Sequence, residues 1–216
     1  MTSNLATKLR AGTQHSHAAA EHTGFMQGFL KGCVDKDSFG KLLSNLYCVY
    51  SQLESELECH QKHPLVSYFY FPELNRKANL EKDLAFYFGS DWKEKVTPSS
   101  AAQAYINRIC EVSATEPVLL LAHAYTRYMG DLSGGQGLKK IVQSVMNLPE
   151  PQGTAFYDFE QISDLKAFKD KYRQVLDELP VNEETADKIV AEANTSFKLN
   201  IQMLQELEGS FATVVS

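Results

Sequence analysis

The sequence predicts an all-α protein built as a single compact multi-helix domain. Apolar residues recur at three- and four-residue spacing in most segments, and the alternating pattern of strands is nearly absent. The 216 residues are 44% hydrophobic and 22% charged, the composition of a globular chain long enough for one substantial core. We therefore expect about eight helices in one domain spanning residues 1–216, without internal repeats or a linker.

Capping and breaking residues set the ends of the expected helices. Asp35 precedes a long apolar stripe, Pro117 begins a helix, and Pro149 and Pro180 end helices. The aromatic run at 68–71 is too short to count as a strand. In chain order the expected helices include residues 12–22, 39–57, 99–112, 117–147, 164–179 and 186–207, the last closed by Gly209.

Charge and cysteine usage narrow the class of protein. The net charge of -6 argues against a nucleic-acid binder or a binder of anionic membranes. No apolar run approaches the ~20 residues that a spanning helix needs, and the first residues lack the apolar core of a secretory signal. Cys33, Cys48, Cys59 and Cys110 form no CxxC pair, which favours free thiols. We therefore expect a soluble, cytoplasmic protein without a membrane anchor.

Four glycines fall inside one expected helix, at Gly130, Gly134, Gly135 and Gly137. Each costs a helix roughly 0.5–1 kcal/mol relative to alanine, against a net stability of about 5–15 kcal/mol for a typical domain. One interpretation is a loop between two helices. The other is a helix whose bare backbone touches a flat ligand and bends around it. The periodicity that resumes at Leu138 favours the second.

Three histidines, His15, His17 and His22, lie in an N-terminal helix otherwise built from small residues. On a helical wheel His17 shares a face with Arg10 and Glu21. An imidazole on a face with little bulk suits the iron of a broad planar ligand with anionic arms, although a lone helical histidine is more often solvated or part of the core. The chain lacks the HExxH, paired ExxH and CxxCH patterns, and one histidine without a second protein ligand is typical of haem with an open sixth position.

The segment AYTRYMGDLSGGQ, residues 124–136, resembles the distal-helix signature of the haem oxygenase family. The resemblance runs from residue 5 to about residue 208, with further blocks at residues 17–21, 45–50, 70–74, 168–173 and 197–200. It implies an all-α fold that sandwiches haem between a proximal helix and a distal helix kinked at residues 130–135. It also implies cleavage of haem to biliverdin, carbon monoxide and iron, at the α-meso carbon, for bilin pigment synthesis. Gly137 departs from the family pattern, which has an aliphatic residue there.

The resemblance also assigns roles to individual residues. His17 would ligate the haem iron, and Glu21 would hydrogen-bond its other ring nitrogen. Asp131 resembles the family's distal acid, acting through ordered water. The other assigned residues are Arg127 and Tyr50 in the same network; Gly130 and Gly134, which steer bound O₂; and Arg10, Tyr125, Ser133, Gly134, Lys169, Arg173 and Phe197 as further haem contacts.

The cofactor and partners follow from the same resemblance. Haem b is both substrate and cofactor, O₂ is the co-substrate, and no separate protein-bound metal is expected. The electron donor of the soluble forms from photosynthetic microbes and plastids is ferredoxin, which is acidic. Because this chain is itself net negative, docking would need a local basic patch, formed by Lys139, Lys140, Arg10, Lys169 and Arg173.

Two other functions stay open from the residues themselves. The first is a haem storage or sensing module on the same fold, for which an acid beside the glycines would have no use. The second is a helical hydrolase with a cysteine nucleophile, such as a thiamin-salvage enzyme. Cys59 and His60 are neighbours in sequence, so they point apart on a helix and form no convincing nucleophile–base pair.

Overall fold

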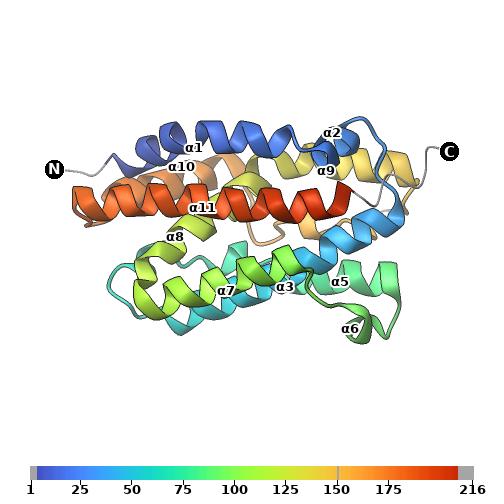
Figure 1. Cartoon of the computed structure of the whole chain (residues 1–216), viewed down its shortest axis with the longest axis horizontal. Coiled ribbons are helices and arrows are strands. Elements are labelled where there is room, and N and C mark those ends of the chain that lie inside the picture. Colours follow the sequence, from blue (N-terminus) through green and yellow to red (C-terminus); the bar gives the residue numbers. More distant parts are fainter. Residues whose placement is uncertain (1–3, 150, 209–216) are drawn as a thin grey trace.

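The computed structural model describes residues 4–149 and 151–208, and within them it contains helices and connections but no strand. The predicted all-α class is confirmed. Figure 1 shows two groups of helices lying one above the other, with α8 (Leu120–Ala124) running between them. One group consists of α1 (Leu5–Glu21), α2 (Gly24–Leu30), α9 (Gly130–Met146), α10 (Leu165–Glu178) and α11 (Glu183–Glu208). The other contains α3 (Lys36–Cys59), α5 (Lys77–Phe88), α6 (Trp92–Lys95) and α7 (Ser100–Thr115).

Two long helices organise the core: α11 joins the two groups, and α3 lies at the centre of the second. Helix α11 packs along α1 on one side and along α7 on the other, while α3 packs against α5 and α7. Their buried faces supply much of the core, and burial of such apolar stripes stabilises a helical fold more than helix propensity does. The described residues hold more helices than the expected eight because α2, α4 (Val66–Phe69), α6 and α8 are too short for a periodic signal.

Local caps explain where the long helices begin and end. The Asp35 carboxylate accepts the Ser38 N–H at 2.8 Å at the start of α3, and Asp164 caps α10 in the same way. Asn147 ends α9 in the left-handed conformation, with φ of 48°. The aromatic run at 68–71 begins as the end of α4, which agrees with its rejection as a strand. The expected closure at Gly209 lies outside the described residues.

The helix expected over residues 117–147 is interrupted once. It comprises η2 (Pro117–Leu119), α8, η3 (Tyr125–Met129) and α9, and η3 is a π-helical segment. The glycine run is regular α-helix, since the glycines with positive φ among the described residues are Gly32, Gly89 and Gly153. The backbone thus stays α-helical through the glycines, and the bend expected at residues 130–135 stays a prediction. A π turn, a distortion frequent at functional sites, lies directly before them at residues 125–129.

Two further properties of the described residues bear on function. None of their helices combines the length and apolar character needed to cross a bilayer. The four cysteines are free thiols, as their spacing predicts.

Candidate active site

A buried polar network connects the start of α9 to α3. Tyr50, on α3, donates its hydroxyl proton to the Asp131 carboxylate and accepts a hydrogen bond of 3.2 Å from Arg127 Nε. Arg127 Nη2 lies 4.0 Å from Asp131, and both side chains are about 10% exposed. Since Arg127 and Asp131 are four residues apart, the helix presents them on neighbouring turns of one face. The three residues predicted to share a network are thus in contact.

Burial is the main influence on the acid of this network. It raises the pKa of Asp131, although the charges of Arg127 and Arg76 and the Tyr50 hydrogen bond oppose the shift. Burial likewise raises the pKa of Tyr50 well above its ordinary value, so Tyr50 stays a neutral donor. A carboxyl group whose proton is held more tightly than in water is suited to general-acid work.

The glycines beside this network expose bare backbone. A Cβ atom built on Gly130, Gly134 or Gly137 would meet no atom within 4 Å. These positions share one helix face, and the unexpected glycine at 137 extends it by a turn. Gly135 is different, because its Cβ would lie 3.1 Å from the Tyr157 ring, so close packing explains that glycine. Ser133, predicted as a ligand contact, is exposed.

His17 lies on α1 with more than half of its side chain exposed. Its Nδ1 is 3.7 Å from the Glu21 carboxylate, which is longer than a hydrogen bond, so the expected bond between them is not formed in this geometry. The edge of Phe197, on α11, contacts the imidazole at a ring separation of 5.9 Å. Within the described residues no hydrogen bond engages the imidazole, which leaves it free to bind a metal ion. His15 and His22 are exposed, as predicted.

Helix α11 connects these two sides of the site. Phe197 touches His17, and Asn200, three residues further along, accepts a hydrogen bond of 2.5 Å from Arg127 Nη1. Three residues of an α-helix rise about 4.5 Å, so the imidazole and the acid network meet α11 on adjacent turns.

A third group of residues lies at the other predicted end of the site. Burial raises the pKa of the half-buried Tyr125, and nearby Thr13, Arg173 and Arg10 oppose the shift. The charges of Arg10 on α1 and Arg173 on α10 thus both act on Tyr125. The binding of carboxylate arms by these residues stays a prediction. Arg173 also pairs with Asp170 at 2.7 Å. Lys169 lies one turn before Arg173 on α10 and is partly buried.

The structure also contains functional candidates that the sequence reasoning missed. Asn200 received no role, although it lies on the same face of α11 as Phe197. Glu54, one turn after Tyr50, is buried and accepts the Lys77 N–H at 3.2 Å. The Tyr128 hydroxyl is buried without a hydrogen-bond partner among the described residues. For Glu54, the sequence offered one indication, the four-residue spacing that places it on the same helix face as Tyr50.

Glu54 makes the stability of the protein depend on pH. Burial raises its pKa from 4.5 to about 7, despite the N–H groups of Arg76 and Lys77. The folded state therefore holds a proton that the unfolded state releases, and stability falls as pH rises from about 4.5 to above 7, by up to about 3 kcal/mol. The free energy of unfolding, measured with urea at several pH values across this range, should change less with pH in Glu54→Gln than in the parent. Glu58 is exposed, so Glu58→Gln should keep the pH dependence of the parent. The same pH dependence in all three proteins would contradict this role for Glu54.

An exposed imidazole and a buried acid network that meet α11 on adjacent turns, beside bare backbone in an all-α fold, fit the class of helical proteins that ligate haem through one histidine. A family model described as "Heme oxygenase" matches residues 3–206. Heme oxygenase 1 of Nostoc sp. is 56% identical over 215 residues, covering 100% of this chain and 90% of that protein. The chain belongs to the heme oxygenase family.

Solved structures agree with this membership. Heme oxygenase-1 from the cyanobacterium Synechocystis sp., determined in complex with heme, superposes with a TM-score of 0.96 at 54% identity, covering 98% of this chain and 96% of that one. Heme oxygenase from Leptospira interrogans gives a TM-score of 0.92 at 44% identity, covering 95% of this chain and 100% of that one.

Proposed function

We propose that this protein binds haem b and, with O₂ and electrons from a partner, cleaves it at the α-meso carbon to biliverdin, carbon monoxide and ferrous iron. The observation that carries the proposal is the contact of Asp131 with Tyr50 and Arg127, next to the uncovered backbone of Gly130 and Gly134. The product is an open tetrapyrrole, so the reaction would supply bilin pigment synthesis and release iron.

The residues present fit haem on two counts. One wall is helical backbone at Gly130 and Gly134, where added Cβ atoms would project into open space, as close approach to a flat ring requires. The opposite side needs an imidazole without a competing hydrogen bond, and within the described residues His17 makes none. Haem supplies an iron that binds and activates oxygen, and a ring that is oxidised.

Asp131 would hold a proton close to the oxygen-binding side of the ring. Because Tyr50 donates to the carboxylate, and Arg127 to Tyr50, the acid has a fixed orientation. Ordered water bonded to this network would carry the proton to the reacting oxygen. Such water would keep the Asp131 carboxyl from donating directly, which would distinguish this site from one with a direct acid, as in a peroxidase.

The orientation of the ring would depend on the cationic end of the site. Arg10, Arg173 and Lys169 would bind the propionates, with the Tyr125 hydroxyl as a further donor. By holding the propionates, these residues would set which edge of the ring lies under the glycines, and hence which meso carbon is attacked.

Gly134→Ala separates the stability of the helix from its function. Because residue 134 is α-helical and its Cβ would meet nothing within 4 Å, we expect the haem-free variant to gain about 0.5–1 kcal/mol of stability. The same methyl group would project towards the ring, and we expect haem affinity to fall at least about tenfold. Thermal unfolding and haem titration measure the two effects. Gly137→Ala, one turn further along, is the matched control for helix propensity, and unchanged affinity in Gly134→Ala would mean that Gly134 does not face the ring.

The decisive experiment adds hemin, a chemical reductant and O₂ to the purified protein. We expect a sharp Soret band, which then decays as biliverdin accumulates, and chromatography against the four biliverdin isomers should identify the α isomer. A stable Soret band with no bilin under these conditions would mean that the protein only binds haem.

Ferredoxin is the electron donor we propose, docking on basic residues near the site. Lys139 pairs with Asp158 and Arg173 with Asp170, whereas no ion pair in the described parts of the chain engages Arg10, Lys140 or Lys169. The charge available to an acidic donor is therefore smaller than the sequence suggested.

Turnover with ferredoxin should consequently fall as ionic strength rises from about 0.01 to 0.15 M, because screening shortens the reach of these charges. Turnover with a small uncharged reductant is the control and should change little. Lys140→Glu should weaken the ferredoxin-driven rate more than Lys62→Glu, which lies in the connection after α3. Salt-independent rates with ferredoxin would remove this surface from the docking site.

A further inference from the structure

Helix α11 carries a line of polar residues at four-residue spacing, two of them buried and the third partly buried, and each contacts a different part of the molecule. Glu192 binds Arg108 of α7 and His123 of α8, and Ser196 shares a hydrogen bond with the Tyr105 hydroxyl. Asn200 accepts from Arg127 in η3. The π-helical segment therefore has an attachment to α11 just before it, at His123, and another within it, at Arg127.

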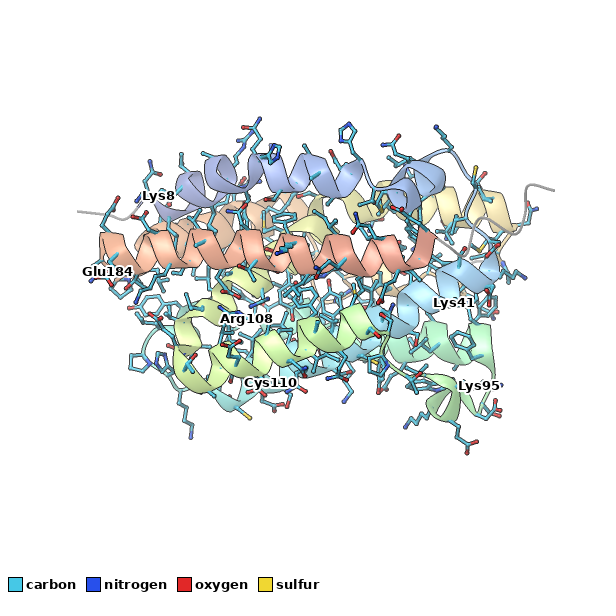
Figure 2. All side chains as sticks on the ribbon, viewed as in Figure 1. Lys8, Lys41, Lys95, Arg108, Cys110 and Glu184 are labelled. Carbon is cyan, nitrogen blue, oxygen red and sulfur yellow. The ribbon has the colours of Figure 1, made fainter. Side chains whose placement is uncertain are left out.

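Glu192 is the centre of the first attachment. Arg108 binds it through two nitrogens, at 3.0 and 2.6 Å, and His123 Nε2 lies 2.9 Å from the same carboxylate. Figure 2 shows Arg108 on α7, facing α11. Burial raises the pKa of Glu192, but the hydrogen bonds from His123 and Arg108 outweigh it, so its pKa lies below the ordinary value and the carboxylate stays charged.

A buried ionic cluster of this kind is an expensive way to obtain stability, because each charge loses its hydration. The position of the cluster, directly before the π turn, suggests that it orients this segment of the helix. A π turn is rarer than an α turn, and it decides how the residues that follow are rotated about the helix axis. Asp131 is one of those residues, and Arg127 lies within the π turn itself.

We propose that Glu192, His123 and Arg108 form a clamp that positions the π-helical segment and thereby the Arg127–Tyr50–Asp131 network. His123 and Glu192 are positioning residues, since they act on the acid through the helix. The catalytic consequence rests on the proposed function, but the geometric one does not, because it exists in the haem-free protein.

Hydrogen exchange of the haem-free protein tests the clamp directly. His123→Leu removes the hydrogen bond to Glu192, and we expect the amides of residues 125–131 to exchange at least about tenfold faster. The amides in the middle of α3 and α5 should be unaffected. His123→Gln, which can still donate to Glu192, should stay close to the parent. Lys188→Gln, an exposed ion-pair residue on α11, is the matched control.

A second measurement reports the acid network itself. In the ferric haem complex, the pH at which the absorption spectrum changes between its acid and alkaline forms should shift in His123→Leu and return towards the parent value in His123→Gln. Should His123→Leu fail to fold, Arg108→Met provides the test. Arg108 is partly exposed, and its replacement removes one of the two partners of the Glu192 carboxylate.

Three results would overturn the clamp: parent-like exchange at residues 125–131 in His123→Leu, acceleration spread equally over all helices, or no recovery in His123→Gln. None of these depends on haem cleavage, so they are distinguishable from a failure of the proposed function.

Discussion

Replacing His17 by alanine should abolish the spectrum of imidazole-ligated ferric haem and lower haem affinity by at least about tenfold, since even indirect partners of a metal ligand change affinity by 10–100-fold. The side chain makes one ring contact, with Phe197, and is more than half exposed, so the substitution should leave the fold intact. Titration of hemin, followed at the Soret band and by resonance Raman for the iron–histidine stretch, measures both effects.

Two controls make this result specific. His15→Ala removes an exposed imidazole from the same helix and should leave the spectrum unchanged. Added imidazole should restore a parent-like spectrum in His17→Ala, because the free base can occupy the vacated position. An unaltered spectrum in His17→Ala would assign the iron to a different side chain.

Asp131→Ala should bind haem with nearly parental affinity and yet lose biliverdin formation by about 10²–10⁴-fold, the contribution typical of a positioned general acid. Without the carboxylate, Tyr50 loses its hydrogen-bond acceptor, and the network loses the ordered water that Asp131 would hold. Since the proton delivery is then no longer controlled, peroxide-driven oxidation of an added phenol should rise. The measurements are bilin yield per haem and the rate of phenol oxidation.

Matched variants separate the acid from its surroundings. Asp131→Asn keeps the shape but cannot supply the same proton, and should resemble alanine in yield. Tyr50→Phe keeps the carboxylate and loses one hydrogen bond, so its yield should lie between those of the parent and Asp131→Ala. Asp170→Asn, an exposed carboxylate on α10, should behave as the parent. Full biliverdin yield from Asp131→Ala would place the proton donor at another residue.

Much of this arrangement could be predicted because it follows from helical spacing. The four-residue interval between Arg127 and Asp131 predicts that they share one face of a helix, and the return of apolar periodicity at Leu138 correctly favoured helix over loop. The open face at Gly130 and Gly134 agrees with the prediction of bare backbone. Their assignment to haem contact, like that of Arg10 and Lys169, remains a prediction that the experiments above test.

The features that the sequence did not predict are set by tertiary contacts. The π turn at residues 125–129 was not predicted, because its residues carry no signature that distinguishes a π turn from an α-helix. The role of Asn200 depends on the packing of α11 against η3, between residues more than seventy positions apart. Lys139 was predicted to be available for docking, but it pairs with Asp158, which is nineteen positions away in the sequence.

The regular α-helical backbone of residues 130–137 has a consequence for laboratory evolution. Because Gly130 and Gly134 are helical and open, almost any amino acid could replace them in the empty protein, and most would make it more resistant to heat. A thermostability screen run without ligand would thus enrich variants that can no longer take up the ring. The same screen run with hemin present should reject them, so comparing the two outcomes would map the ligand's footprint on this helix.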